Sequence, residues 1–269
     1  MTDNTHSSPP PLVEFQNVSV VRDGHRLLDR VSLTIREGEH IAILGPNGAG
    51  KSSLIRAITR EYYPSCRGPD TVFRFRGLDT WDAFDLRSHL GVVSGDLQQT
   101  FTRGISGREV VLSGFFSSIG LSLSHEVTDA MEQKTDEILE FLGVTHIADR
   151  PMTELSSGEG RRLLIGRALV HDPGTLLLDE PTNSLDLSAL HTFRATLRKI
   201  AQSGTGIILV THSLPDIIPE ISRVVLMRDG AVRKDGPKAE VLTSEAIGDL
   251  FRVPVRVREE DGYYYATGY

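Results

Sequence analysis

Short apolar runs with an alternating pattern dominate the start of the chain. Residues 12–20 (LVEFQNVSV) and 31–35 (VSLTI) alternate between apolar and polar side chains, which is typical of half-buried strands. Residues 40–44 (HIAIL) are apolar at successive positions, as in a strand that is buried on both faces. Gly and charged residues separate these runs, so we expect tight turns and antiparallel pairing among the opening strands.

The middle of the chain changes from strands to helices. A period of 3.6 predicts a helix over residues 51–62, and short apolar runs predict strands at 71–75 and 89–93. From about residue 95 to residue 159 the pattern is mainly helical, most clearly in residues 127–143 (VTDAMEQKTDEILEFLG). This stretch therefore predicts an inserted α-helical subdomain.

Buried strands alternate with helices in the second half of the chain. Residues 175–180 (TLLLDE) and 206–212 (GIILVTH) predict strands, residues 187–202 predict a helix, and residues 214–221 continue the alternation. Such a pattern is typical of a parallel sheet with helices on its faces. The last stretch predicts a terminal hairpin around Asp261-Gly262.

Composition and charge exclude several classes of protein. Among the 269 residues, 29 Lys and Arg against 36 Asp and Glu give a net charge of −7, which argues against a whole-surface nucleic-acid footprint. Cys66 is the single cysteine, so no intrachain disulfide can form, which fits a reducing compartment. No apolar run approaches the roughly 18 residues that a membrane span needs. Residues 1–11 lack the features of a secretory signal, and we expect a disordered tail there.

A glycine-rich loop lies between the predicted strand at 40–44 and the helix that follows. The loop fits the pattern G-x-x-x-x-G-K-[ST] and consists of Gly45, Pro46, Asn47, Gly48, Ala49, Gly50, Lys51 and Ser52, with Ser53 after it. Glycines let successive N–H groups turn inward, and the helix start adds unpaired amides and a positive dipole end. Lys51 would neutralise β- and γ-phosphate charge, and the Ser52 hydroxyl would bind Mg²⁺. The loop therefore predicts a polyphosphate site.

Two adjacent acids end the buried strand at 175–180. Asp179 and Glu180 follow a Thr and three Leu residues, and carboxylates at such a position cost desolvation unless they meet a cation. Ligands of open α/β sheets bind at the carboxyl ends of strands. We expect Asp179 to orient Mg²⁺ and Glu180 to polarise the attacking water.

The segment LSSGE begins an amphipathic helix. Ser156 and Glu159 have the spacing of a capping box, so one reading is simply a good helix start. A helix N-terminus rich in Ser and Gly is also an anion site, and which reading holds depends on what lies opposite.

The order of these motifs resembles that of an ATP-binding-cassette (ABC) ATPase domain. The resemblance covers nearly the whole chain and rests on the phosphate loop, LSSGE, LLLDEP, SLD and VTH, in that order. It implies an α/β P-loop NTPase fold with a mixed or parallel core sheet, an N-terminal antiparallel β subdomain and an inserted α-helical subdomain. The core then covers about residues 12–94 and 160–251, the helical insert about 95–159, and a C-terminal hairpin about 252–269.

The resemblance also assigns roles, with ATP and Mg²⁺ as ligands. Residues 45–53 match the Walker A loop, Asp179 matches the Walker B carboxylate, and Glu180 matches the catalytic base. Lys51 and His212, the latter matching the switch histidine, complete the catalytic group. Ser156, Ser157, Gly158 and Glu159 match the signature, which in this family contacts the γ-phosphate of ATP bound to the opposite subunit. Ser184, Leu185 and Asp186 resemble the D-loop, and Asp186 is a candidate nucleotide contact.

Some positions depart from the family pattern. Ser157 and Glu159 stand where Gly and Gln are commoner in the signature, and Glu159 adds a carboxylate. In the Q-loop, the expected Gln position is Gly95, with Gln98 and Gln99 displaced downstream. We expect one of these two, assigned here as Gln98, to reach Mg²⁺ or its water shell.

A further departure concerns the aromatic residue that usually stacks on adenine. Arg22 stands at that position, in the segment VRDGH. A guanidinium can stack on a base, so Arg22 is a candidate adenine contact. The alternative is a solvated turn.

One phosphate loop and one signature imply that the active unit is a dimer of such domains, closed around two ATP molecules. Three functions stay open: the ATPase subunit of a membrane transporter, a soluble ABC ATPase acting on ribosomes or nucleic acid, and a nucleotide-dependent regulatory module without turnover. The first implies a permease partner and a place at the cytoplasmic face of a membrane. Nucleic acid is not an expected partner.

An apolar run in the insert, residues 106–116, bears on the partner. Its Val110, Val111, Leu112, Phe115 and Phe116 either form the insert's own core or offer a docking face for a membrane-embedded partner. The segment also resembles the cytosolic ATPases grouped with molybdenum-type transporters.

Overall fold

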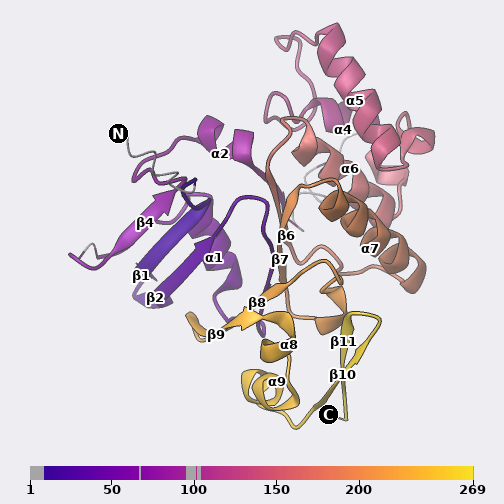
Figure 1. Cartoon of the computed structure of the whole chain (residues 1–269). Helices are drawn as coiled ribbons and strands as arrows, with labels where there is room; N and C mark the ends of the chain where they lie inside the picture. The colour runs from indigo at the N-terminus through magenta and orange to yellow at the C-terminus, as the bar shows by residue number, and fades with distance from the viewer. Residues whose placement is uncertain (1–8, 67, 95–100, 102–103, 269) are drawn as a thin grey trace, which may run out of the picture.

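A six-stranded sheet forms the centre of the computed structural model, which describes residues 9–66, 68–94, 101 and 104–268 (Figure 1). Its strand order is β5-β6-β7-β3-β8-β9, and all neighbours pair in parallel except β8 and β9. The predicted α/β fold with a mixed, largely parallel core sheet is therefore confirmed. The strands are β3 (His40–Leu44), β5 (Leu90–Ser94), β6 (Thr175–Asp179), β7 (Gly206–Thr211), β8 (Arg223–Arg228) and β9 (Ala231–Pro237).

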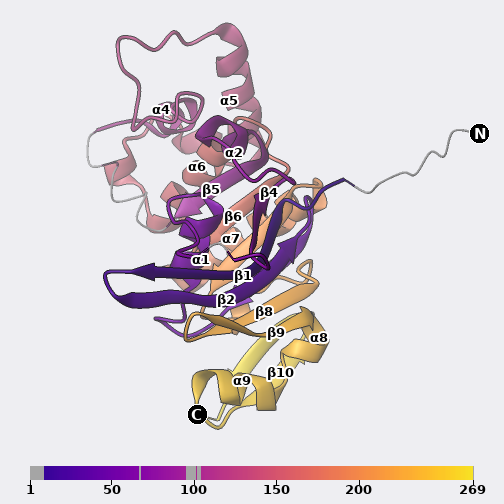
Figure 2. The ribbon, with the colours of Figure 1, turned by 90° about the vertical axis from the view of Figure 1, so that its left-hand side faces the viewer.

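A smaller antiparallel sheet lies beside the central one, with the order β2-β1-β4 (Figure 2). Its strands are β1 (Val13–Arg22), β2 (His25–Ile35) and β4 (Val72–Phe75). The antiparallel pairing predicted for the first two strands is confirmed, with Phe15 opposite Leu33.

The prediction that residues 40–44 would join this antiparallel pair is wrong. β3 lies inside the central sheet and pairs in parallel with both β7 and β8. Residues 41–44 are fully buried, and four successive apolar side chains need cover on both faces of the sheet. β2 alternates between buried and exposed positions and so belongs to a sheet with one open face. Burial therefore decides the pairing of β3, although β2 is closer in sequence.

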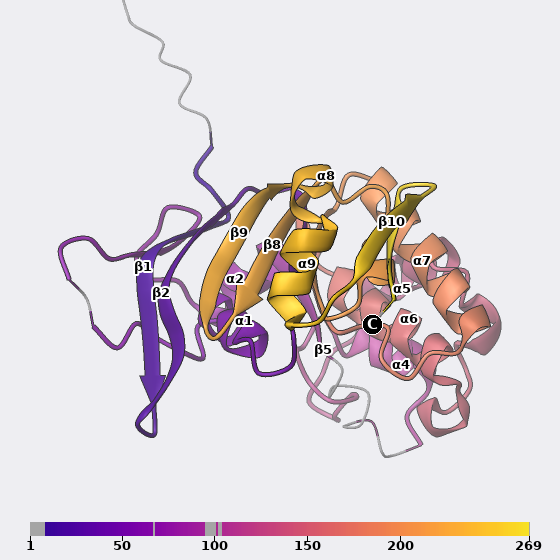
Figure 3. The same ribbon diagram turned by 90° about the horizontal axis from the view of Figure 1, so that it is seen from below.

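Helices cover the central sheet on both sides (Figures 1 and 3). Helix α1 and the antiparallel sheet lie on one side, and α4 to α7 lie on the other (Figure 1). The bounds are α1 (Lys51–Ile58), α2 (Ala83–His89), α4 (Gly107–Leu112), α5 (Asp129–Phe141), α6 (Ser157–Leu169), α7 (Leu187–Gln202), α8 (Lys238–Val241) and α9 (Ser244–Phe251). Single 3₁₀ turns form at η1 (Thr145–Ile147), η2 (Met152–Glu154) and η3 (Leu214–Asp216).

The C-terminal part of the chain differs in two respects from a simple strand–helix alternation. Residues 214–221 form only the turn η3, because Pro219 opposes a longer helix, whereas Pro215 lies in the first turn, where proline is tolerated. The chain ends in an antiparallel hairpin of β10 (Arg256–Glu260) and β11 (Tyr263–Thr267), with Asp261-Gly262 at its turn. The domain boundaries given above stay predictions.

Two hydrophobic cores lie on opposite faces of the central sheet. Successive residues of β3 contribute to different cores: Ile41 and Ile43 pack toward α1 and the antiparallel sheet, and Ala42 and Leu44 pack toward α6 and α7. The alternation of side chains along a strand explains this division. The sheet is thereby fixed on both faces, which gives its strand ends a rigid support.

The apolar run of the insert belongs to the second of these cores. Val110, Val111 and Leu112 of α4 are buried, and they cluster with residues of α5 and α6. Of the two readings offered for these three residues, the insert's own core is therefore the correct one. In the part of the chain that the structure describes, no helix combines the length and the apolar character that crossing a bilayer requires.

We predict that Phe193→Ala lowers the free energy of unfolding by about 3–5 kcal/mol, because it leaves a cavity where α7 packs on the sheet. Phe193 is 1% exposed. Leu187, on the same helix, is 86% exposed, and Leu187→Ala as the control should change the free energy by no more than about 0.5 kcal/mol. Urea unfolding measures both, and equal effects of the two substitutions would contradict this packing.

Candidate nucleotide site

The carboxyl ends of three neighbouring strands meet at one edge of the central sheet. Leu44 at the end of β3 lies opposite Thr211 at the end of β7, and Asp179 at the end of β6 lies opposite Val210. The glycine-rich loop follows directly on β3, Glu180 on β6 and His212 on β7. The register of the sheet therefore brings together groups that lie far apart in the sequence.

The glycine-rich loop is packed tightly against the strands behind it. Gly48 and Gly50 adopt positive φ angles of 79° and 97°, which side chains rarely allow. A Cβ atom at Gly45 would lie 2.2 Å from the carbonyl oxygen of Met227, so only glycine fits there. The loop leads into α1, whose first turn contains no acidic residue. This arrangement suits a polyphosphate, because the glycines let the backbone come close to the ligand and the helix start adds a positive dipole end.

The side chain of Lys51 turns back onto the glycine-rich loop. Its Nζ donates hydrogen bonds to the carbonyl oxygens of Gly45, at 2.8 Å, and Pro46, at 3.2 Å. The Nζ also lies 3.3 Å from Oε1 of Glu180, and the side chain is only 6% exposed. A buried ammonium group is thus held directly over the loop, where it can bind an anion.

Glu180 is held from three directions. Its backbone N–H donates to the carbonyl oxygen of Val210 at 2.8 Å, which extends the β6–β7 ladder by one residue. One carboxylate oxygen accepts a hydrogen bond from Nδ2 of Asn183 at 2.8 Å and lies 2.6 Å from Nδ1 of His212. The other oxygen faces Lys51. The site therefore contains a chain of contacts that runs from Lys51 through Glu180 to His212.

The environment of Glu180 favours its ionised form. Burial opposes ionisation and is the largest single influence, but the hydrogen bond from Asn183 and the charges of Lys51 and His212 together outweigh it. The pKa of Glu180 therefore lies below the ordinary value for a glutamate.

Two oxygen donors suit Mg²⁺ at this edge. The Ser52 hydroxyl lies in the first turn of α1, and the half-buried Asp179 carboxylate ends β6. Hydroxyl and carboxylate oxygens are the ligands that Mg²⁺ takes when phosphate oxygens supply the remainder. These two residues fit the ion in their chemistry. Gln98, the third residue assigned to the metal, lies outside the described residues, as do Gly95 and Gln99.

A cavity of about 460 Å³ lies over the glycine-rich loop. Residues 47–53 and Glu180 form one part of its wall, and Arg26, Leu27, Asp229 and Gly230 form another. Sequence reasoning missed the second group. Asp229-Gly230 reads as an ordinary turn dipeptide after a strand, and no local signal shows that it packs on a loop about 180 positions earlier in the chain.

Arg22 does not belong to the lining of this cavity as the structure describes it. Its guanidinium lies over the ring of Tyr62, 5.1 Å from the ring centre, and Arg56 approaches the same ring at 5.4 Å. Arg26, four residues later, does line the cavity. Whether Arg22 contacts adenine stays a proposal.

The LSSGE segment begins α6 with a complete capping box. The Ser156 hydroxyl accepts a hydrogen bond from the N–H of Glu159, and the Glu159 carboxylate accepts one from the N–H of Ser156 at 2.9 Å. Hydrogen bonds from the Ser156 side chain and backbone are the main reason that the pKa of Glu159 lies below its ordinary value. The added carboxylate is therefore engaged with its own helix start.

The signature and the D-loop share a second cavity, of about 540 Å³. Ser156, Ser157, Gly158 and Glu159 line it together with Ser184, Leu185 and Asp186. Asp186 also caps α7, because its carboxylate accepts a hydrogen bond from the N–H of Ala189 at 2.8 Å. None of the lining residues described for this cavity also lines the cavity over the glycine-rich loop. The glycine-rich loop and the signature, which the sequence predicts to contact nucleotide, thus line separate cavities within one chain.

We predict that Lys51→Met raises the pKa of Glu180, because it removes the ammonium group 3.3 Å from the carboxylate. NMR titration of side-chain carboxyl carbons in the nucleotide-free protein measures this pKa. The exposed Lys199 of α7 offers a control, and Lys199→Met should leave the pKa of Glu180 unchanged. An unchanged pKa in Lys51→Met would contradict the ion pair.

The same pKa shift has a consequence for stability. Because the folded-state pKa of Glu180 is lowered, its ionised form stabilises the fold at neutral pH. This contribution is lost as the pH falls through the folded-state pKa, so acid should destabilise the wild type more than Lys51→Met.

Comparisons with known proteins agree with this geometry. The family model for ABC transporters matches residues 28–183. The hemin import ATP-binding protein HmuV of Bradyrhizobium diazoefficiens is 34% identical over 262 residues, covering 94% of this chain and 93% of that protein. An uncharacterized ABC transporter ATP-binding protein of Bacillus subtilis, YlmA, is 34% identical and covers 91% of this chain and 93% of its own.

Solved structures share the fold. One is cbiO1 from Clostridium perfringens, part of the ABC transporter complex cbiONQ, with 27% identity and a TM-score of 0.73, covering 88% of this chain and 93% of that one. A putative metal-chelate type ABC transporter gives a TM-score of 0.74 at 22% identity, covering 95% of this chain and 96% of that one, and shows the fold alone. The likeness to molybdenum-type transporters stays a prediction. The family match and the relatives together show that this chain belongs to the ABC transporter family, as an ATP-binding ATPase.

Proposed function

We propose that this chain powers a membrane importer by hydrolysing ATP as a dimer at the cytoplasmic face of the membrane. The observation that carries the proposal is the separation of two cavities: one contains the glycine-rich loop with Lys51 and Glu180, and the other contains the signature and the D-loop. Two copies arranged head to tail would place each signature over the other copy's nucleotide. Bound ATP would then hold the two copies together.

The glycine-rich loop and Lys51 would bind the β- and γ-phosphates. The Lys51 ammonium group contacts two carbonyl oxygens and Glu180. A triphosphate offers more negative charge than the two carbonyl oxygens or the Glu180 carboxylate, so the Lys51 ammonium group would turn to the triphosphate on binding. Ser52 and Asp179 would hold Mg²⁺, with Gln98 as the third candidate, and the ion would neutralise charge on the phosphates.

Glu180 would act as the general base toward the attacking water. A carboxylate with a lowered pKa is a weak base, and Lys51 is one cause of that shift. When Lys51 turns to the phosphates, the charge facing Glu180 decreases and its basicity rises. His212 keeps its contact with the same carboxylate and so orients it. Nucleotide binding would thereby prepare the base for its reaction.

The signature would contact the γ-phosphate from the opposite copy. The N-terminus of α6 offers the amides of Ser157 and Gly158 and a positive dipole end, while the Ser156 hydroxyl donates to the Glu159 carboxylate at 2.7 Å. Glu159 adds a negative charge, but its carboxylate is turned onto Ser156 within the capping box. This arrangement explains how the site can accept an anion in spite of the departure from the family pattern.

The transport role rests on the relatives, several of which are named as import ATP-binding proteins. A permease would dock on the helical insert, where Ile119 and Leu123 are exposed apolar side chains. The two other functions considered, a soluble ATPase acting on ribosomes or nucleic acid and a regulatory module without turnover, find no support in the comparisons.

We predict that Glu180→Gln binds Mg-ATP but hydrolyses it at least about 100-fold more slowly, because the general base is lost. Phosphate release measures the rate, and light scattering measures the ATP-dependent dimer, which should persist in this variant. Glu140→Gln, at an exposed position on α5, is the matched control and should behave as wild type. Hydrolysis at the normal rate in Glu180→Gln would show that the base is assigned wrongly.

A further inference from the structure

We propose that Asp229 binds the ribose hydroxyls of the nucleotide and that a cluster of three arginines holds it in place. The inference rests on the proposed function, since it assigns a residue to the same nucleotide cavity. Asp229 lines that cavity on the side formed by Arg26, Leu27 and Gly230. Neither the family pattern nor the sequence assigns it a role.

The turn that contains Asp229 is joined directly to the glycine-rich loop. The N–H of Gly230 donates to the carbonyl oxygen of Ala49 at 2.9 Å, and the N–H of Asp29 donates to the carbonyl oxygen of Gly230 at 2.9 Å. A Cβ atom at Gly50 would lie 3.1 Å from Cα of Gly230. The turn is therefore fixed beside the point where the loop passes into α1.

This position corresponds to the ribose. The phosphates bind along the loop and at the N-terminus of α1, and the ribose is the next group along the nucleotide. Asp229 lies one residue from Gly230, which contacts Gly50, and it faces the same cavity as Lys51. A carboxylate accepts hydrogen bonds from both hydroxyls of a ribose, and acidic residues take this role in other nucleotide-binding folds.

A carboxylate this close to a triphosphate would repel it unless its charge were balanced. One oxygen of Asp229 lies 3.5 Å from Nε of Arg228, 3.7 Å from Nη2 of Arg233 and 3.4 Å from Nη2 of Arg252. The three guanidinium groups come from β8, β9 and the end of α9. They leave a net positive charge around Asp229, so the carboxylate can accept hydrogen bonds without opposing the phosphates.

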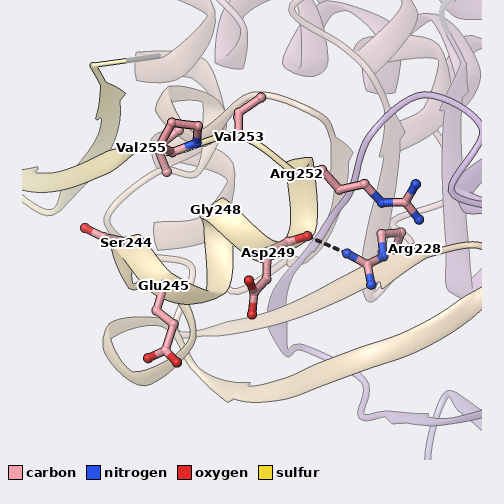
Figure 4. A pocket seen from close by; sticks show the side chains of 9 residues that line it. Arg228, Ser244, Glu245, Gly248, Asp249, Arg252, Val253 and Val255 are labelled. Atoms are coloured by element: carbon pink, nitrogen blue, oxygen red, sulfur yellow. Dashed lines mark hydrogen bonds between the residues drawn. The ribbon is translucent and has the colours of Figure 1, made fainter.

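The arginines are themselves anchored by the fold. Figure 4 shows Arg228 and Arg252 on the groove beside α9, where Arg228 donates a hydrogen bond to the backbone oxygen of Asp249. Nε of Arg233 donates to the carbonyl oxygen of Arg228 at 3.2 Å. The cluster therefore connects α9 to the ribose end of the cavity.

The test compares ATP with 2′,3′-dideoxyATP, which lacks both hydroxyls, by calorimetric titration in the Glu180→Gln background. That background should bind ATP about fivefold to tenfold more tightly than the dideoxy analogue, as expected for hydrogen bonds to a carboxylate. Adding Asp229→Gly should make the two affinities equal. Glycine suits the positive φ of 53° at this position, so the turn is kept.

The chain offers a matched control in another strand-joining Asp-Gly turn, Asp261-Gly262, where Asp261 has a φ of 52°. Asp261→Gly should keep the preference for ATP. Two results would overturn the assignment while leaving the proposed function intact. One is equal affinity for ATP and the dideoxy analogue in Glu180→Gln alone, and the other is a preference for ATP that survives the addition of Asp229→Gly. Failure to bind either nucleotide would instead overturn the nucleotide site, and the inference with it.

Discussion

The pairing of β3 with β7 brings the glycine-rich loop and the groups around Glu180 to one edge of the central sheet. β3 is buried on both faces, so it must lie inside the sheet, and its end then adjoins the end of β7. β6 is the next neighbour of β7. The glycine-rich loop, Glu180 and His212 consequently meet at one edge, although 167 positions separate the first residue of the loop, Gly45, from His212.

Charge balance at this edge explains the contacts of Lys51. Lys51 is almost fully buried and needs partners, which it finds in the loop carbonyls and in Glu180. A bound triphosphate would replace these partners and release Glu180 for its role toward water. The positive end of α6 lines a separate cavity, where Glu159 of its own capping box is turned onto Ser156, and a nucleotide held by a second copy would complement the helix start.

Local sequence signals predict the loops and the helix starts because their physics is local. Glycine spacing fixes the conformation of residues 45–50, and Ser156 with Glu159 forms its capping box within one turn. The same reasoning fails where a contact is distant. It pairs residues 40–44 with the wrong strands, and it gives no hint that Asp229 and Gly230 lie against the loop, because burial and packing of the whole sheet decide both.

The most direct test of the central claim is the ATPase activity of a mixture of two inactive variants. Lys51→Ala removes the phosphate contact of one copy, and Ser157→Asp adds a repelling charge to the signature of the other. If each site combines the loop of one copy with the signature of its partner, a mixed dimer contains one intact site, and mixing restores turnover. A mixture that stayed as inactive as each variant alone would contradict the account.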